Sequence, residues 1–326
     1  METDIKNITD IIVSGSIARD EIMSFPGLFA DHIAKDRLRN LNVSFVVNRL
    51  VKELGGTGTN IAYNARLVTK KPIHLLGAVG KDGDDFFDFF KKYGIGTKGV
   101  SKHEDLYTAT GKVITDAKQN QIWSFYYGAL EKTREIRKED TKGKRPVLIL
   151  SATHRTPFLR MQAQAKKLKI LYAYDPGMVL TWIRDKDLRE GVEGATWMIG
   201  NEYEMTQIKK RLKIDIKQML TAGKTIITTL GAKGVLYQSK EKTLGVAGYR
   251  VKKALDPTGA GDAWRGGFWG SLAEGKSIED SLKTANALAS FVVESYGTVN
   301  HKPTIKDITR RADTLDIKKI TKEKRK

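Results

Sequence analysis

The chain has 326 residues, of which 40% are hydrophobic and 29% charged, which excludes a disordered protein and allows one large α/β domain or two smaller ones. It contains no cysteine and no run of about 18 apolar residues, so disulfides, thiolate metal sites and cysteine nucleophiles are excluded, and we expect a cytoplasmic protein without a membrane span or secretory signal. The formal net charge of +19 favours an anionic ligand such as a nucleoside triphosphate.

The N-terminal part of the chain predicts short strands followed by polar loops. Residues Ile8–Ser14 are apolar and β-branched, which is typical of a buried parallel strand. Asp20 follows just past the carboxyl end of this strand, where ligands lie in open α/β sheets, although such a residue more often caps a loop. Leu41–Val47 has the composition of a second strand.

A double glycine precedes the first predicted helix. Gly55 and Gly56 stand before Thr57–Asn60, and the residues up to Val68 have helical spacing. Without Cβ atoms at the glycines a ligand can approach the backbone, and the Asn60 side chain offers both a donor and an acceptor. A flexible turn with an ordinary helix cap is the alternative interpretation.

The next segment predicts a strand, a helix and a hairpin. Ile73–Gly80 is an apolar strand with a helix behind it, and Tyr107–Thr115 and Gln121–Leu130 are two strand-like runs that predict the hairpin. Period-two spacing places three aromatic residues of the second run on one face, which suits either core packing or a wall for a flat ligand: Trp123, Phe125 and Tyr127.

From about residue 131 onward, strands and helices alternate, which predicts βαβ units and a parallel sheet. No linker rich in Gly, Pro or Ser divides the chain, so we expect one main domain with a small β addition. The predicted strands are Pro146–Leu150, Leu171–Ala173, Thr196–Ile199 and Thr225–Thr229, and the predicted helices are Thr156–Lys169 and Glu202–Arg211.

The stretch Ala254–Gly270, ALDPTGAGDAWRGGFWG, carries the strongest chemical signal. Asp262 lies directly behind the turn formed by Gly259, Ala260 and Gly261, and directly ahead of a segment that suits a buried helix. The amides of this turn and the helix dipole form an anion site. A base beside an anion site is what phosphoryl transfer to an alcohol requires, and no Walker P-loop is present to cradle the phosphates instead.

The string DPTGAGD resembles the second signature of the ribokinase-like (PfkB) family of sugar and nucleoside kinases. The likeness covers nearly the whole chain and is closest to the bacterial type of adenosine kinase. It implies a ribokinase-like α/β fold, a mostly parallel central sheet flanked by helices, as one domain over residues 1–326 with a small β-sheet lid from about 17–50 and 104–130. Because related kinases can dimerise through the lid, the resemblance also suggests a homodimer formed through this sheet. The closer match rests on GSIARDEIMSFPGLF, LNVSFVV, ELGGTGTNIAYN, QIWSFYYGAL, DPTGAGDAWRGGF and ESYGT.

The same resemblance assigns roles to individual residues. It makes Asp262 the base that takes the proton of the substrate hydroxyl, and the amides of Gly259, Ala260 and Gly261 the site of the transferred phosphoryl group. The residues implied to bind the nucleoside are Ser16, Asp20, Gly55, Gly56 and Asn60 for the ribose and Phe125 for the base. Those implied to bind ATP are Asn201, Thr229, Gly231, Gly259 and Gly261, with Glu204 organising Mg²⁺ indirectly and Asp256, together with the Gly297 loop, at positions where family members often hold K⁺.

The expected activity is ATP-dependent phosphorylation of the 5'-hydroxyl of adenosine or a related nucleoside, giving the monophosphate and ADP, as in purine salvage. Two departures leave alternatives open. Ala18 stands where ribose-specific relatives commonly carry Asn, and Gly177-Met178-Val179 follows Asp175-Pro176 where adenosine kinases of this type tend to have glutamine. A kinase for ribose or a phosphorylated sugar is one alternative.

The other alternative, from a different class of protein, is a basic nucleotide- or nucleic-acid-binding protein without turnover. It is favoured by the net charge and by the tail from His301 to Lys326, which has ten basic and four acidic residues. However, no basic run is interleaved with aromatic residues as in a single-strand binding platform, so we do not expect nucleic acid as a partner.

Overall fold

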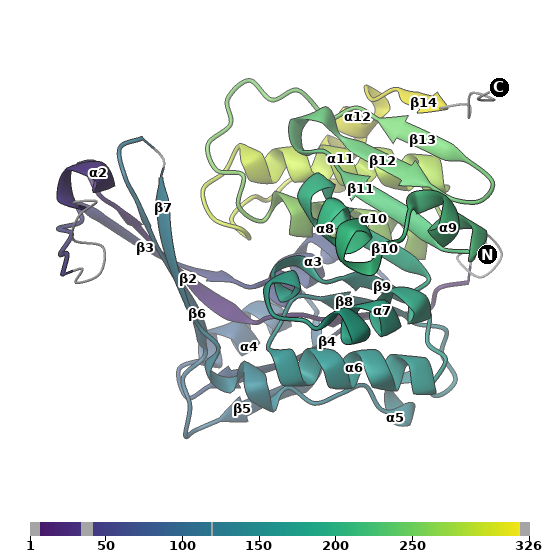
Figure 1. Cartoon of the computed structure of the whole chain (residues 1–326), viewed down its shortest axis with the longest axis horizontal. Coiled ribbons are helices and arrows are strands. Elements are labelled where there is room, and N and C mark those ends of the chain that lie inside the picture. Colours follow the sequence, from purple (N-terminus) through teal and green to yellow (C-terminus); the bar gives the residue numbers. More distant parts are fainter. Residues whose placement is uncertain (1–6, 34–41, 119, 320–326) are drawn as a thin grey trace.

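Two β-sheets organise the protein, whose computed structural model describes residues 7–33, 42–118 and 120–319 (Figure 1). The larger sheet has ten strands within these residues. Neighbouring strands are parallel from β11 to β5 and antiparallel from β11 to β14, which confirms the predicted mostly parallel sheet. In spatial order the strands are β14 (Ile317–Lys319), β13 (Thr243–Val246), β12 (Val235–Gln238), β11 (Thr225–Thr229), β10 (Trp197–Asn201), β9 (Tyr172–Asp175), β8 (Val147–Ser151), β1 (Ile11–Ser14), β4 (Ile73–Gly80) and β5 (Gly96–His103).

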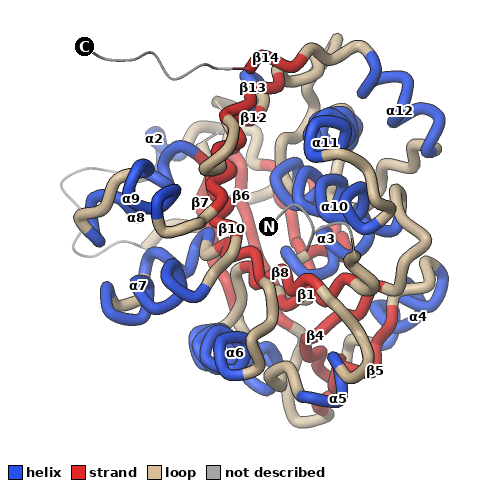
Figure 2. The backbone as a smooth tube through the Cα atoms, turned by 90° about the vertical axis from the view of Figure 1, so that its right-hand side faces the viewer, coloured by secondary structure: helices blue, strands red, loops and turns tan. Residues whose placement is uncertain are grey.

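Helices cover both faces of the large sheet (Figure 2). One layer consists of α3 (Thr57–Arg66), α4 (Asp84–Lys92), α10 (Ala260–Ala273) and α11 (Ile278–Val293), with α12 (Ile305–Asp313) against α11. The other layer consists of α6 (Arg155–Lys167), α7 (Asp185–Gly194), α8 (Glu202–Leu212) and α9 (Ile216–Thr221). Two short helices, α2 (Phe29–His32) and α5 (Lys138–Thr141), and three 3₁₀ turns, η2 (Gly128–Lys132), η3 (Gly177–Thr181) and η4 (Gly231–Lys233), lie between these elements.

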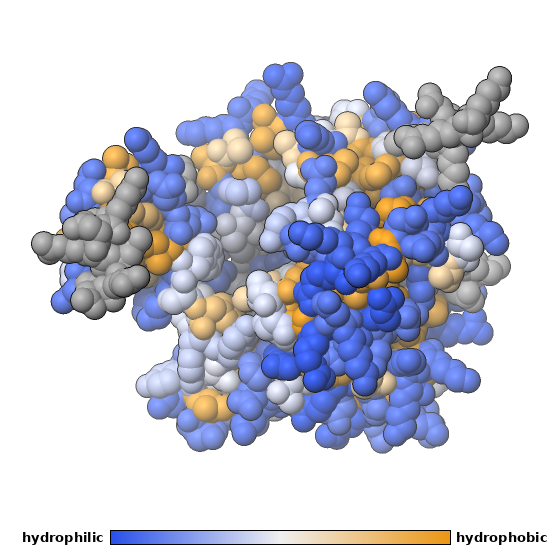
Figure 3. All heavy atoms as spheres, viewed as in Figure 1, coloured by the Kyte–Doolittle hydropathy of each residue, from blue (hydrophilic) through white to orange (hydrophobic). Residues whose placement is uncertain are grey.

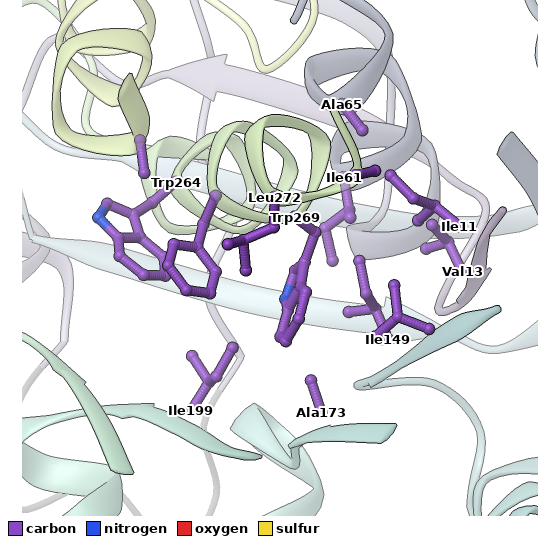
Figure 4. Close-up of a cluster of buried hydrophobic side chains, with 14 of the residues drawn as sticks. Ile11, Val13, Ile61, Ala65, Ile149, Ala173, Ile199, Trp264, Trp269 and Leu272 are labelled. Carbon is purple, nitrogen blue, oxygen red and sulfur yellow. The ribbon is translucent and has the colours of Figure 1, made fainter. Parts of the chain in front are cut away.

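Each face of the large sheet has its own hydrophobic core, because successive side chains of a strand point to opposite faces. Ile11 and Val13 of β1 point into the core beneath α10, whereas Ile12 points into the core beneath α6. Figure 4 shows the first core, in which Trp264, Trp269 and Leu272 of α10 point toward the strands. The helix therefore lies flat over the sheet, and its glycines allow a close approach to its neighbours.

Outside the two cores the visible surface is largely hydrophilic (Figure 3). Hydrophilic side chains are densest over the layer that contains α7 and α8. In the described part of the chain, no helix combines the length and apolar character that a membrane crossing needs.

The smaller sheet projects to one side of the large one (Figure 1). Its strands in spatial order are β3 (Arg49–Gly55), β2 (Ala18–Ser24), β6 (Ala109–Thr115) and β7 (Gln121–Tyr126). β6 and β7 are the two arms of the predicted hairpin and pair antiparallel, whereas β2 and β6 are parallel. The strand β3 lies mostly beyond the residue range 17–50 that the sequence suggested for this sheet.

The predicted strand Leu41–Val47 is wrong. Residue 41 lies outside the described residues, residues 42–47 have no regular structure, and the strand that pairs with β2 begins only at Arg49. Within this stretch Phe45 packs in an aromatic cluster, because its ring lies 5.0 Å from those of both Phe25 and Phe29. Val46, in contrast, is 84% exposed, so only part of the apolar run is buried.

Candidate active site

The first turns of α3 and α10 meet because the two helices pack unusually closely. A Cβ atom on Gly266 would lie 2.6 Å from the backbone nitrogen of Ala65, and one on Gly270 would lie 2.5 Å from a methyl group of Val68. Gly266 and Gly270 are four residues apart, so both face the same neighbour. Asp262, one turn earlier on this face, comes against Asn60, whose Nδ2 donates a 2.8 Å hydrogen bond to Oδ2 of Asp262.

The predicted anion site lies at the N-terminus of α10. Gly259 is the N-cap with a φ of 80°, and a Cβ there would lie 2.8 Å from the methyl group of Thr298, so both conformation and space require glycine. The amide of Ala260 donates to the carbonyl of Pro257 at 3.1 Å. Among the described residues, none accepts a hydrogen bond from the amides of Gly259 and Gly261, which leaves these two for an anion.

A buried ion pair that the sequence did not predict lies next to Asp262. Nε and Nη2 of Arg265 each bond a carboxylate oxygen of Asp175 at 2.5 Å, and Nη1 donates to the carbonyl of Gly261 at 2.9 Å. The side chains of Arg265 and Asp175 are 8% and 4% exposed. Arg265 follows Asp262 by three residues and thus shares its helix face, a spacing that could have drawn attention to it.

Burial and the neighbouring charges together set the pKa of Asp262, the predicted base. Burial raises its pKa to about 6, although the guanidinium of Arg265 and the hydrogen bond from Asn60 act to lower it, and the charges of Asp175 and Glu204 raise it further. At neutral pH the carboxylate is ionised, but its pKa of about 6 lies close to the pH of the solution, so it accepts a proton readily. A base with such a pKa is well matched to taking a proton at physiological pH.

Asp20 lies in the small sheet, close enough to the predicted base Asp262 for their charges to interact. It sits on β2 opposite Glu53 of β3 and Gly111 of β6. A Cβ on Gly55 would lie 2.1 Å from Oδ2 of Asp20, so this glycine makes room for the carboxylate. Burial raises the pKa of Asp20 to about 7, with further contributions from the negative charges of Asp262, Asp256 and Glu53. The structure therefore brings two carboxylates from distant parts of the sequence into one electrostatic environment.

The other predicted ribose residues occupy the start of α3. Gly56 is its N-cap with a φ of 88°, and a Cβ there would lie 2.4 Å from the carbonyl oxygen of Ser16. The hydroxyl of Ser16 accepts a 2.9 Å hydrogen bond from the amide of Thr57, so it is engaged in fixing the helix start. Oδ1 of the buried Asn60, in contrast, has no partner in the described part of the protein and remains an acceptor for a ligand hydroxyl.

The predicted aromatic face lies on the same side of the small sheet as Asp20. Phe125 and Tyr127 pack against a small core formed by Ala18, Ala109 and Leu130, and their ring centroids are 5.1 Å apart. Trp123 is 48% exposed, and its indole NH donates to Gln121 at 3.1 Å. The Cβ position of Gly111, which is 3.3 Å from Oδ1 of Asp20, lies 3.4 Å from atoms of both Phe125 and Trp123. The wall beside Asp20 therefore includes Trp123 at its exposed end as well as Phe125 and Tyr127.

The predicted nucleotide residues lie at the carboxyl ends of β10 and β11. Asn201 and Thr229 are register partners on these two strands. Gly231 has a φ of 57° and no atom within 4 Å of its Cβ position, so a ligand could approach the backbone there. Glu204 forms a capping box with Asn201, with bonds of 2.8 and 2.9 Å, and burial together with the charge of Asp175 raises its pKa.

Each of the two candidate metal positions, at Glu204 and at Asp256, has one carboxylate. Among the residues described, no three His, Cys, Asp or Glu side chains gather into a metal-binding group. Glu204 fits an indirect role toward Mg²⁺, which usually keeps several waters and binds one or two carboxylates together with substrate phosphates. Asp256 accepts a 2.9 Å bond from the amide of Thr258 through Oδ1, and its other oxygen has no donor among the described residues.

Comparison with known proteins identifies the family of the chain. The chain matches the pfkB family of carbohydrate kinases over residues 20–305. It is 30% identical over 284 residues to a nucleoside kinase of Methanothermobacter thermautotrophicus, which covers 85% of this chain and 90% of the relative.

Solved structures show the same similarity. The nucleoside kinase of Burkholderia thailandensis in complex with inosine has a TM-score of 0.83 and 26% identity, covering 93% of this chain and 97% of that one. The nucleoside kinase of Methanocaldococcus jannaschii, an archaeal member of the ribokinase family, has a TM-score of 0.83 and 25% identity, covering 94% and 99%. The Burkholderia enzyme is also known in complex with ADP-inosine, with a TM-score of 0.81. The chain therefore belongs to the PfkB family of carbohydrate kinases and is an ATP-dependent kinase that acts on an alcohol group.

Proposed function

We propose that the protein transfers the γ-phosphoryl group of ATP to the 5'-hydroxyl of a nucleoside, with adenosine as the substrate favoured by the sequence motifs. One observation supports the proposal most directly: Asp262 lies at the N-terminus of α10, accepts a hydrogen bond from Asn60 and interacts electrostatically with Asp20 of the small sheet. Beside it, two backbone amides have no acceptor among the described residues. Relatives that are nucleoside kinases support a nucleoside over a free sugar.

In the proposed mechanism Asp262 accepts the proton of the 5'-hydroxyl. As the new bond between this oxygen and the γ-phosphorus forms, the bond from the γ-phosphorus to the bridging oxygen of ADP breaks, and ADP leaves with the electron pair. The amides of Gly259 and Gly261 stabilise the charge on the transferred group. Asp20 and the free Oδ1 of Asn60 bond the ribose hydroxyls and hold the 5'-oxygen in line.

The nucleotide is proposed to lie along the ends of β10 and β11. Asn201, Thr229 and Gly231 contact ATP, and Glu204 holds Mg²⁺ indirectly. Bound Mg²⁺ would neutralise charge on the β- and γ-phosphate oxygens. Asp256 and the Gly297 loop form the proposed K⁺ position.

The small sheet is proposed to act as the lid of a single kinase domain. Because water left in the site would accept the phosphoryl group in place of the substrate, closure of this sheet over Asp20 would favour transfer over ATP hydrolysis. The exposed side of the lid is also the proposed contact surface of a homodimer. A role in cytoplasmic purine salvage would follow from the activity.

The proposal is tested by ADP release in a coupled assay with adenosine, inosine, guanosine, cytidine, ribose and fructose 6-phosphate as acceptors. We expect turnover with at least one nucleoside, exceeding that with either sugar. Asp262→Asn should lower kcat by about 10²–10⁴-fold, whereas the matched control Asp313→Asn, an exposed residue of α12, should not. Turnover with sugars alone would replace the nucleoside assignment with the sugar kinase, and an active Asp262→Asn variant would overturn the role of the base.

A further inference from the structure

Three ring side chains, Phe125, Tyr127 and His154, lie in a row that begins beside Asp20 of the small sheet. The Cβ position of Gly111 lies 3.3 Å from Oδ1 of Asp20 and 3.4 Å from both Cδ2 of Phe125 and Cζ3 of Trp123, so these side chains flank the same glycine. The Phe125 and Tyr127 ring centroids are 5.1 Å apart, and those of Tyr127 and His154 are 5.0 Å apart. A flat base on a ribose held by Asp20 would extend along this wall.

His154 ends the loop that follows β8, next to the loop that follows β9. The two strands pair in register, with Ser151 opposite Asp175. The Cβ position of Gly177 lies 3.5 Å from the Cβ of Ala152, so the loops touch. Directly after Asp175 the β9 loop continues with Pro176, Gly177 and Met178, which carry no polar side chain, and Met178 is 47% exposed. The neighbouring β8 loop, which ends at His154, offers a polar side chain in their place.

The imidazole of His154 is prepared as a hydrogen-bond donor. It is the N-cap of α6, and its Nδ1 accepts a 3.4 Å bond from the amide of Thr156, which leaves the proton of the neutral ring on Nε2. Burial lowers the pKa of His154, so the ring is neutral at physiological pH. In the part of the protein that the structure describes, no residue accepts a hydrogen bond from Nε2.

We infer that His154 is a specificity-determining residue whose Nε2–H donates to an acceptor on the edge of a purine base stacked beside Phe125. The inference rests on the proposed nucleoside kinase activity. Two atoms share the required chemistry, O6 of a 6-oxopurine and N7 of any purine. Contact with O6 would favour inosine and guanosine over adenosine, which carries an amino group at this place, whereas contact with N7 would not discriminate among them.

The test uses three variants of the full-length protein. His154→Phe removes both the cap and the donor. His154→Asn keeps the cap, since Asn is a strong N-cap residue, but its amide is too short to reach the base. His154→Gln places an amide donor at about the reach of Nε2. Kinetics with inosine, adenosine and 7-deazainosine, and the KM for ATP, are measured for each variant together with its thermal unfolding.

A base contact present in both the ground state and the transition state changes KM and not kcat. We expect His154→Asn and His154→Phe to raise the KM for inosine about 3- to 10-fold, with kcat and the KM for ATP unchanged, and His154→Gln to restore most of the loss. A loss with inosine and 7-deazainosine but not with adenosine identifies O6. A loss with inosine and adenosine but not with 7-deazainosine identifies N7.

Two results contradict the inference in different ways. If the variants keep the wild-type KM for all three nucleosides, or lose activity only in proportion to thermal stability, His154 is a helix cap and nothing more. If the wild-type protein phosphorylates no nucleoside, the proposed function itself fails. Wild-type turnover is therefore measured first, so that the two failures are distinguished.

Discussion

The side-chain amide of Asn60 donates a 2.8 Å hydrogen bond to Asp262 across 202 residues of sequence, and so joins the proposed ribose contact to the proposed base. Because α3 and α10 touch through Gly266 and Gly270, the two side chains meet at the helix starts and not further along. In the proposed mechanism the bond leaves Oδ1 of Asp262 for the substrate hydroxyl and Oδ1 of Asn60 for the ribose.

Replacing Asn60 by Ala should move the acid limb of the pH profile to higher pH. The donated hydrogen bond favours the ionised carboxylate, so its loss raises the pKa of Asp262 above about 6. We expect kcat/KM to fall at a higher pH than in the wild type, and the KM for the nucleoside to rise about 10-fold. Profiles between pH 5 and 8 measure both. Asn120→Ala, which removes a comparable 2.9 Å bond to Asp116 in the hairpin turn, should leave the profile unchanged.

Substitutions of Arg265 and of Asp175 should move the acid limb of the pH profile in opposite directions. The guanidinium lowers the pKa of Asp262 and the carboxylate of Asp175 raises it, so Arg265→Met moves the limb to higher pH and Asp175→Asn moves it to lower pH. Each change also breaks a buried pair, at a cost of about 3–5 kcal/mol in the free energy of unfolding. Shifts of the same sign in both variants would show that the profile reports distortion of the site and not its charges.

Sequence patterns predict those parts of the fold that depend on short stretches of the chain. The alternation of strands and helices after residue 131 predicts the parallel sheet, and Thr225–Thr229 is found as predicted. The composition of Asp256–Asp262 predicts a helix start with a carboxylate beside it. In β1, only the first residues of the predicted run fall outside the strand, which begins at Ile11.

Contacts between distant segments could not be predicted in this way. The Arg265–Asp175 pair and the Asn60–Asp262 bond depend on which elements pack together. The spacing of apolar residues along the sequence does not reveal which elements those are. β3 was missed for a different reason: its strand RLVKELG lies in a small, partly solvated sheet, so it lacks the apolar run that marks a buried strand. In the apolar run just before it, Phe45 packs against Phe25 and does not pair in a sheet.

Gly55→Ala should weaken binding of the nucleoside without affecting ATP. The added methyl group would lie 2.1 Å from Oδ2 of Asp20, so the carboxylate must move away from the ribose. We expect the KM for the nucleoside to rise about 10-fold or more, with the KM for ATP unchanged. Gly223→Ala is the control, because its φ of 79° makes Ala unfavourable although no atom lies within 4 Å. That variant should lose about 1 kcal/mol of stability and keep both KM values.

The buried imidazole of His301 should make the protein less stable as the pH falls from 7 to 5. The ring is 3% exposed, its Nε2 lies 2.7 Å from Oδ1 of Asn64, and burial lowers its pKa to about 4. Nδ1 is buried without a partner among the described residues, so a proton there would have no acceptor. In the unfolded chain the pKa returns to about 6.5, and the unfolded state therefore binds the proton first.

The stabilisation from the neutral imidazole is thus complete above pH 6.5 and declines as the pH falls toward 4. Between pH 7 and 5 the loss attributable to His301 is about 2 kcal/mol, measured as the difference in urea unfolding between the wild type and His301→Gln. His103→Gln, a half-buried residue of β5 beside Ser101, is the matched control and should keep the wild-type slope. An NMR titration of His301 in the native protein checks the pKa directly even if the glutamine variant folds poorly. A titration near 6.5 would contradict the prediction, because the imidazole would then accept its proton as readily in the folded protein as in the unfolded chain.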